Sequence, residues 1–185
     1  MSNYKNLRGI AVRDRNKSVR VATHSHVLKS LLDEVKCHVT VLEHGMGISS
    51  TPLLHSHKNV SSFVSFEDDP SWARCSGCTG NHEIFPYSPA QAKKIIEETH
   101  PYLVFLDGPG LQRNELFEIC LKLNVHVIVE HDSETHDENA VEFRRRLLKE
   151  HGYIGVVDTS KNPETAIYVK DAGLIKNLQL PHTTY

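Results

Sequence analysis

The sequence lacks the long apolar runs and the dense cysteines that mark several common classes of protein. No stretch approaches the roughly 20 apolar residues that a bilayer-spanning helix needs. The chain does not open with the basic and apolar segments of a signal peptide. Four cysteines in 185 residues are too few for a disulfide framework. We therefore expect a cytoplasmic protein with no membrane partner.

The sequence also lacks a strong excess of charge of one sign. The formal net charge is −2 with histidine neutral, so composition alone does not favour binding to nucleic acid. The charges are unevenly placed, however. Residues 1–20 carry six basic side chains against one acid, Asp14, whereas residues 130–138 are strongly acidic. The basic segment keeps a nucleic-acid partner open as a second interpretation.

Internal repeats and low-complexity linkers are absent, and the length fits one main domain. Helical and strand patterns alternate instead, which predicts a doubly wound α/β fold with a mostly parallel seven-stranded sheet and helices on both faces. The last two strands are joined by SKNPE and predict a C-terminal antiparallel hairpin. We expect a basic arm or helix at 1–24, a Rossmann-like domain at 25–176 and a tail at 177–185. The expected strands cover 38–45, 60–68, 82–87, 102–110, 125–132, 153–159 and 165–171, and the expected helices cover 25–35, 49–57, 70–77, 88–100, 114–124 and 138–153.

The full dinucleotide-binding pattern GxGxxG is missing, because residue 50 is serine. A shorter glycine motif is present at the end of the first strand, where Gly45 and Gly47 follow Glu43. Glycines there let the backbone approach a ligand closely, although such a loop is often only a tight turn. Glu67 ends the next strand, at the position from which a carboxylate reaches ribose hydroxyls. Together these residues predict a nucleotide-like ligand at the carboxyl edge of the sheet.

These residues resemble the motifs of class I S-adenosylmethionine-dependent methyltransferases, over roughly residues 25–171. The stretch LEHGMGISS resembles the first motif of that family, and Glu67 resembles its ribose-binding acid. The stretch FLDGP at 105–109 resembles the fourth-strand motif of the small-molecule O-methyltransferases. The resemblance implies S-adenosylmethionine as the cofactor. The cofactor-binding residues that it implies are Glu43, Gly45, Gly47, Ser50, Glu67 and Asp107.

The resemblance also implies methyl transfer to a small-molecule acceptor, with oxygen as the expected atom. Glu43 and Asp107 suit the ammonium and the sulfonium cation of the cofactor, and backbone NH groups of the glycine loop suit its carboxylate. Trp72 and Phe85 are candidates for stacking on adenine. The short chain leaves room for a homo-oligomer that completes the acceptor pocket.

Two other interpretations stay open. The first is a nucleotide or nucleic-acid methyltransferase that uses the basic arm. The sequence lacks the [DN]PP[YF] motif of amino-methylating DNA enzymes and the Pro-Cys nucleophile of cytosine C5 enzymes, and DGP stands at 107–109 instead. The second is a non-catalytic descendant of the fold that binds a ligand or a partner protein.

A divalent metal is a further implication of the resemblance. Metal-dependent O-methyltransferases hold an ion with an aspartate after the fourth strand and a polar pair after the fifth. Carried over, the ligands would be Asp107, His131 and Asp132, and the histidine favours manganese, iron or zinc over magnesium. The chain departs from that pattern because His131 replaces an acid, and because no lysine follows Asp107 where the family carries its base.

Without a metal, we expect His131 and Asp132 to be the catalytic residues, with the imidazole as the general base. Glu130 and Asp132 would orient that ring, and His136 is a second candidate for the base. The acidic stretch EHDSETHDE can instead cap the helix that follows it.

The cysteines give weaker indications. Cys75 and Cys78, in CSGC, have metal-like spacing and His82 lies close by in the sequence. No second CxxC completes the four-ligand shell of a structural zinc site, so a zinc ion would need a distant partner. A redox pair or two ordinary loop thiols are the alternatives. We expect Cys37 and Cys120 to be inert core thiols.

Overall fold

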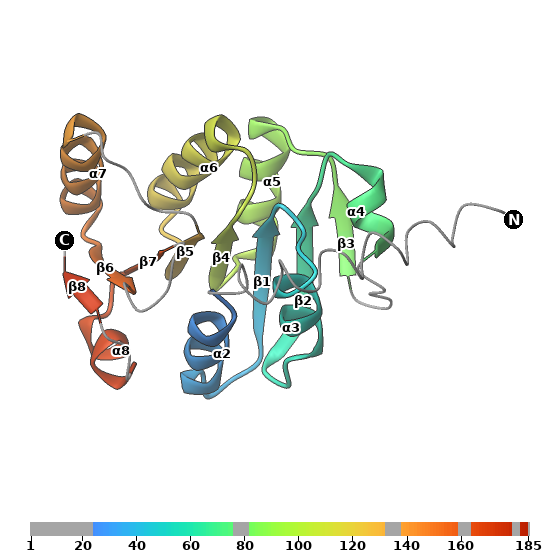
Figure 1. The fold of residues 1–185 in the computed structure, drawn as a ribbon, viewed down its shortest axis with the longest axis horizontal. Coiled ribbons are helices and arrows are strands. Elements are labelled where there is room, and N and C mark those ends of the chain that lie inside the picture. The colour runs from blue at the N-terminus through green and yellow to red at the C-terminus, as the bar shows by residue number, and fades with distance from the viewer. Residues whose placement is uncertain (1–23, 76–81, 132–137, 159–163, 179–181, 185) are drawn as a thin grey trace, which may run out of the picture.

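The computed structural model describes residues 24–75, 82–131, 138–158, 164–178 and 182–184. Within these residues the chain forms one eight-stranded sheet with helices on both faces (Figure 1). The strands are β1 (Val39–His44), β2 (Val60–Phe66), β3 (His82–Phe85), β4 (Leu103–Leu106), β5 (Val127–His131), β6 (Ile154–Asp158), β7 (Thr165–Val169) and β8 (His182–Thr184). The helices are α2 (Ser25–Glu34), α3 (Ser50–Ser56), α4 (Pro70–Cys75), α5 (Pro89–Thr99), α6 (Gly110–Lys122), α7 (Glu138–His151) and α8 (Ala172–Asn177).

The strand order is β3-β2-β1-β4-β5-β7-β6-β8. The five strands β3, β2, β1, β4 and β5 run parallel to one another, whereas β7 runs antiparallel to both β5 and β6. The predicted doubly wound sheet and its C-terminal hairpin are therefore confirmed. The structure adds the short strand β8, which pairs with β6 and comes from the segment that the sequence assigned to the tail.

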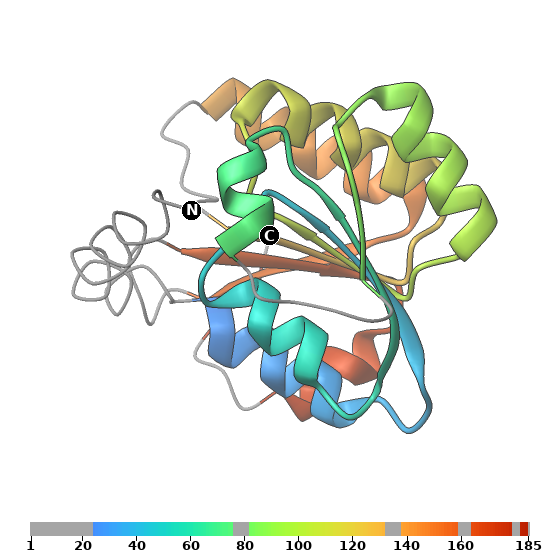
Figure 2. The same cartoon turned by 90° about the vertical axis from the view of Figure 1, so that its right-hand side faces the viewer.

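Two helical layers enclose the sheet. Figure 2 shows α5, α6 and α7 on one face and α2, α3 and α8 on the other. The core is divided in the same way, because neighbouring strand residues face opposite sides of the sheet. Leu42 and Val104 belong to the cluster under the first helical layer, and Val41 and Phe105 to the cluster under the second. Both faces of the central strands are thus buried, as the apolar runs of the sequence predict.

Local sequence signals set the helix boundaries. Ser88 caps α5 by accepting a hydrogen bond from the backbone N of Gln91, and Pro89 follows as the first helical residue. The helix ends at Thr99, and its C-cap His100 adopts a left-handed conformation with φ of 45° and is followed by Pro101.

The structure describes more of the C-terminal end of the chain than of the N-terminal end. The predicted basic arm lies outside the described residues, except for His24, which immediately precedes α2. At the other end, Asp171 caps α8 by accepting from the backbone N of Gly173. Among the described residues, every helix is too short or too polar to cross a membrane.

Candidate functional site

A cavity of about 640 Å³ opens at the carboxyl ends of β1, β2 and β4. In doubly wound sheets this edge carries the ligand, at the point where the strand order reverses between β1 and β4. Helix α3, which follows β1, and helix α6, which follows β4, lie on opposite faces of the sheet (Figure 2). The cavity is lined by His24, His44, Gly45, Met46, Gly47, Ile48, Ser49, Phe66, Glu67, Asp68, Asp69, Trp72, Tyr87, Asp107, Gly108, Pro109 and Gln112.

The glycine loop after β1 is packed against the loop after β4. Gly45 has a φ of +84°, and a Cβ built there would lie 2.7 Å from the backbone N of Gly108. A Cβ at Gly108 would overlap the ring of His44. That ring is held by a contact of 3.1 Å between its Nε2 and Gln112 Oε1. Residue 45 must therefore lack a side chain because the two loops approach each other closely there. Gly45 and Gly108 also line the cavity.

Glu67 lies on the cavity wall and ties the loops together. Its Oε2 accepts a hydrogen bond of 2.9 Å from the backbone N of Met46, and its Oε1 accepts one of 2.8 Å from that of Asp69. The backbone N of Gly47 donates to Thr51 Oγ1 at 2.9 Å. The sequence analysis assigned the amides of the glycine loop to the cofactor carboxylate, and two of them, those of Met46 and Gly47, are thus already engaged within the protein.

Asp68 also lines the cavity. Its carboxylate accepts hydrogen bonds from Gln112 Nε2 at 2.9 Å and from the backbone N of Tyr87 at 2.8 Å. These bonds, the one from Gln112 first, hold the pKa of the carboxyl below its usual value. Tyr87, whose ring centroid lies 4.9 Å from that of His44, was not singled out from the sequence. Its place after a short strand of mixed polarity gives little indication of a cavity position.

Glu43 and Ser50 are fully buried and do not line the cavity. Glu43 Oε2 accepts hydrogen bonds from Thr51 Oγ1 at 2.7 Å and from Ser65 Oγ at 3.2 Å. Burial raises the pKa of this carboxyl to about 8, so it is mainly neutral at pH 7. In the structure, Glu43 supports the glycine loop from behind, and its contact with a cofactor stays a prediction.

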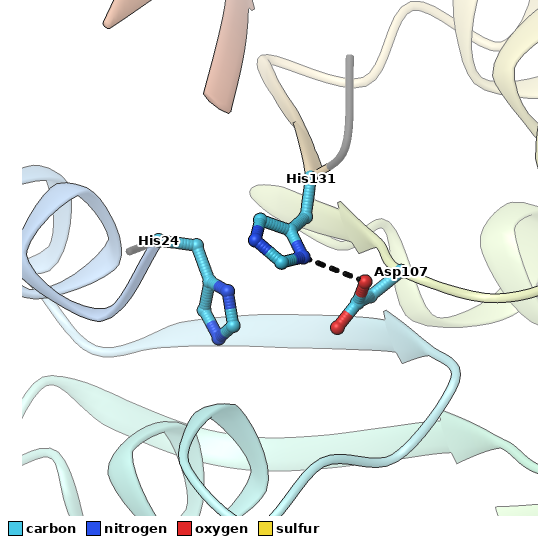
Figure 3. Close-up of side chains that lie close together, drawn as sticks. All are labelled: His24, Asp107 and His131. Atoms are coloured by element: carbon cyan, nitrogen blue, oxygen red, sulfur yellow. Dashed lines mark hydrogen bonds and ion pairs between the residues drawn. The ribbon is translucent and has the colours of Figure 1, made fainter. Parts of the chain in front are cut away.

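Asp107 and His131 meet at the same edge of the sheet, as the sequence predicts from their places at the ends of neighbouring strands. His131 Nδ1 lies 2.9 Å from Asp107 Oδ1, and His131 is 1 % exposed (Figure 3). Asp107 lines the cavity. Asp132, predicted as a catalytic and metal-binding residue, and His136, the second candidate base, lie outside the described residues.

His24 joins this pair and was missed by the sequence analysis. Its ring centroid lies 4.4 Å from that of His131 and 4.8 Å from that of Phe105. Burial, followed by the nearby His131, lowers the pKa of His24 to about 4. The sequence offered only a histidine before a helix, some 80 residues from Asp107, so periodicity could not place it here.

Glu130 does not orient His131, because it forms ion pairs in the opposite helical layer. Its carboxylate accepts from Arg144 of α7, with an Nη2–Oε1 distance of 2.8 Å, and lies 3.5 Å from Arg113 Nε. Tyr168 also donates to it, at 3.1 Å. The sequence expectation for Glu130 is therefore corrected, and Asp107 takes the place beside the imidazole.

The remaining sequence predictions concern two aromatic residues and the four cysteines, and they have different outcomes. Trp72 lines the cavity and is 40 % exposed, whereas Phe85 is not among the lining residues. Cys120 is buried in the core, but Cys37 is exposed, so the expectation of a core position for Cys37 is wrong. The side chains of Cys75 and Cys78 lie outside those that the structure describes.

Comparison with known proteins gives matches among solved structures. A Staphylococcus aureus protein provisionally assigned as a caffeoyl-CoA O-methyltransferase is 15 % identical, with a TM-score of 0.60 over 80 % of this chain and 82 % of that one. Precorrin-6y C5,15-methyltransferase from Geobacter metallireducens is 15 % identical, with a TM-score of 0.51 over 79 % and 87 %. Spermidine synthase from Thermotoga maritima is also 15 % identical, with a TM-score of 0.59 over 84 % and 62 %.

No protein-family model and no curated protein matches the chain. At these identities the matches establish the architecture alone, and the same architecture supports different named activities. The strand order, the antiparallel hairpin and the matched structures agree with one another. The chain therefore has the fold of the class I S-adenosylmethionine-dependent methyltransferases.

Proposed function

We propose that the chain binds S-adenosylmethionine in the cavity described above and transfers its methyl group to a small-molecule acceptor, at oxygen. The observation that supports this proposal is the position of Glu67. It follows β2 and lines a cavity at the switch point of a methyltransferase-type sheet, together with the glycine loop after β1 and Asp107 after β4. A carboxylate at that position accepts hydrogen bonds from ribose hydroxyls.

The chemistry of the cavity fits this cofactor. Its volume of about 640 Å³ is typical of pockets that enclose a ligand of this size. Four carboxyl side chains line it, which suits a ligand with a sulfonium, an ammonium and ribose hydroxyls. These are Glu67, Asp68, Asp69 and Asp107. Trp72 adds an aromatic surface at the mouth, where an adenine ring can stack.

Two amides of the glycine loop are not free to donate to the carboxylate of the cofactor, the role that the sequence predicted for this loop. The carboxylate of the amino-acid tail needs hydrogen-bond donors, but the amides of Met46 and Gly47 are already used by Glu67 and Thr51. Gln112, which lines the cavity, carries a side-chain amide that currently donates to Asp68. We propose that Gln112 exchanges this partner for the ligand.

Bound in this cavity, S-adenosylmethionine would supply a methyl group activated by the neighbouring sulfonium charge. The chain's own task is to position an acceptor oxygen and to remove its proton. In a metal-free site we propose His131 for the proton transfer, because Asp107 holds its Nδ1 at 2.9 Å. Asp132 remains part of the proposal as a catalytic residue.

Calorimetric titration of the purified chain with S-adenosylmethionine and S-adenosylhomocysteine tests the proposal. We expect micromolar dissociation constants for both ligands. Glu67→Gln should weaken binding about 10- to 100-fold, because a hydrogen bond to a charged group contributes about 1.5–3 kcal/mol. Glu118→Gln is the matched control, since Glu118 pairs with Lys122 on the exposed face of α6.

The proposal is wrong if the folded wild-type chain binds neither ligand at millimolar concentration. Circular dichroism and a thermal melt establish that each variant is folded before its titration is interpreted. Equal affinities of wild type and Glu67→Gln would leave a ligand site but remove Glu67 from it.

A further inference from the structure

Three potential metal-binding side chains converge on the cavity edge from distant parts of the chain. His24 immediately precedes α2, Asp107 follows β4, and His131 is the last residue of β5 (Figure 3). One ligand atom from each lies within 4.8 Å of the others. Within the described residues, this is the group of histidine and carboxylate side chains that comes close enough to surround one ion.

The environment of His24 provides a second, independent indication. The side chain is 4 % exposed, and neither ring nitrogen has a hydrogen-bond partner among the described residues. Buried polar atoms are normally satisfied, because leaving one without a partner costs the full loss of its hydration. An imidazole that is buried beside another imidazole and a carboxylate, with its own nitrogens unused, is suited to binding an ion.

The donor set indicates which ions the group would accept. Two imidazoles and one carboxylate favour zinc, iron, manganese and related transition ions, whereas magnesium and calcium prefer shells made of oxygen. Three protein ligands also leave at least one coordination position open. Because His24 and Asp107 line the cavity, that position would face the proposed ligand site.

The distances permit binding after a small movement. Zinc lies about 2.0–2.2 Å from nitrogen and carboxylate donors, which places tetrahedral donors about 3.3 Å apart. His131 Nδ1 and Asp107 Oδ1 are already 2.9 Å apart. Since no two of the three ligand atoms are more than 4.8 Å apart, His24 has to approach the other two by at most about 1.5 Å, a change within reach of a side-chain rotation.

We propose that His24, Asp107 and His131 bind one divalent transition-metal ion at the edge of the cavity. This ligand set shares Asp107 and His131 with the one carried over from the sequence and adds His24, which immediately precedes α2, whereas Asp132 lies outside the described residues. The proposal rests on these three side chains and does not depend on the cofactor. It is an alternative to His131 as a proton acceptor, because an imidazole nitrogen that binds a metal ion has no lone pair left for a proton.

Calorimetric titration of chelator-treated protein with zinc, without S-adenosylmethionine, tests the site. Zinc is the most informative probe, because affinities for a given site generally rise from manganese and iron to zinc. We expect one zinc ion per chain at this site, and magnesium at least about 100-fold weaker. His24→Ala and Asp107→Asn should each weaken zinc binding by about 100-fold or more, since even indirect contacts to ligands change affinity about 10- to 100-fold.

Two controls isolate this site from the other potential ligands. His38→Ala removes an exposed imidazole at the opposite end of β1 and should leave the zinc affinity unchanged. A second control uses a protein that carries Cys75→Ser and Cys78→Ser. This double substitution removes the CxxC thiols, so that any zinc they bind does not contribute to the measured affinity. Cobalt absorption in this background distinguishes nitrogen and oxygen ligands from thiolates, and circular dichroism shows that each variant is folded.

The proposal is overturned if the folded Cys75→Ser, Cys78→Ser protein binds no zinc, or if His24→Ala binds zinc as tightly as its parent. Asp107→Asn provides the second reading if His24→Ala does not fold. Zinc binding without binding of S-adenosylmethionine would leave the metal site standing and contradict the proposed function. The reverse result would keep the proposed function and return His131 to the role of proton acceptor.

Discussion

At the scale of single residues, Glu43 shows how burial changes the chemistry of a motif residue. Its side chain is fully buried, with hydrogen bonds from Thr51 and Ser65. The pKa rises from its ordinary value of 4.5 to about 8. Since the native state holds this proton more tightly than the unfolded chain does, the stabilising contribution is complete below about pH 4.5 and is lost as the pH rises through 8.

Glu43→Gln should therefore increase the free energy of unfolding relative to wild type at pH 8.5 and much less at pH 5. We expect the difference between the two pH values to be about 4 kcal/mol. Urea denaturation of both proteins at the two pH values measures it. Glu118→Gln, an exposed change on α6, should show no such difference, and an equal effect of Glu43→Gln at both pH values would contradict a buried neutral carboxyl.

Gly108 is the second residue whose environment leads to a prediction. An added Cβ would overlap the His44 ring, which is buried and held by Gln112. Gly108→Ala should therefore destabilise the protein by about 2 kcal/mol, as overpacked substitutions do. Gly110→Ala, two residues on, meets nothing within 4 Å and should change stability by less than about 0.5 kcal/mol in chemical denaturation. Equal effects of the two substitutions would show that the loops can separate without cost.

At the scale of elements, α7 shows that three adjacent arginines have different roles. The Arg144 side chain is 17 % exposed and binds Glu130, whereas the Arg146 side chain is 63 % exposed. The guanidinium of Arg144 also lies 5.0 Å from the centre of the Phe117 ring. The helix therefore presents Arg145 and Arg146 to solvent, and one arginine of the run is unavailable to an anionic partner.

Arg144→Ala should lower the free energy of unfolding by about 3 kcal/mol, because it leaves the buried Glu130 carboxylate without its main partner. Arg146→Ala removes an exposed pair with Glu150 and should change stability by less than about 1 kcal/mol. Guanidinium denaturation of both variants makes the comparison. If both variants lost a similarly small amount of unfolding free energy, Arg113 alone would be enough to neutralise the buried carboxylate of Glu130.

The element scale also shows what the sequence could predict. The boundaries of α5 follow from Ser88, Pro89 and Pro101, which act on neighbouring residues only. Buried strands such as β4 and β5 follow from their continuous apolar runs. Strand β8 has three residues and follows a proline, so its strand conformation depends on pairing with the edge of β6. Contacts of that kind are set by tertiary structure and leave no local pattern.

At the scale of the whole molecule, the strand order could be inferred, but the contents of the site only in part. Asp107 and His131 were placed together correctly because neighbouring parallel strands end at one edge. His24 was missed because its contact with His131 is set by how α2 packs against the sheet, which no local sequence pattern indicates. The predicted partner of Glu130 was wrong for a related reason, since its actual partner, Arg144, belongs to a helix later in the chain.

The two edges of the sheet have a consequence for association between copies of the chain. Within the described residues the outermost strands are β3, with four residues, and β8, with three. Such short edges present few unpaired backbone groups and disfavour strand addition from another molecule. If this chain forms the homo-oligomer that its small size leaves room for, we expect the copies to meet through helices or loops, with each sheet ending within its own subunit.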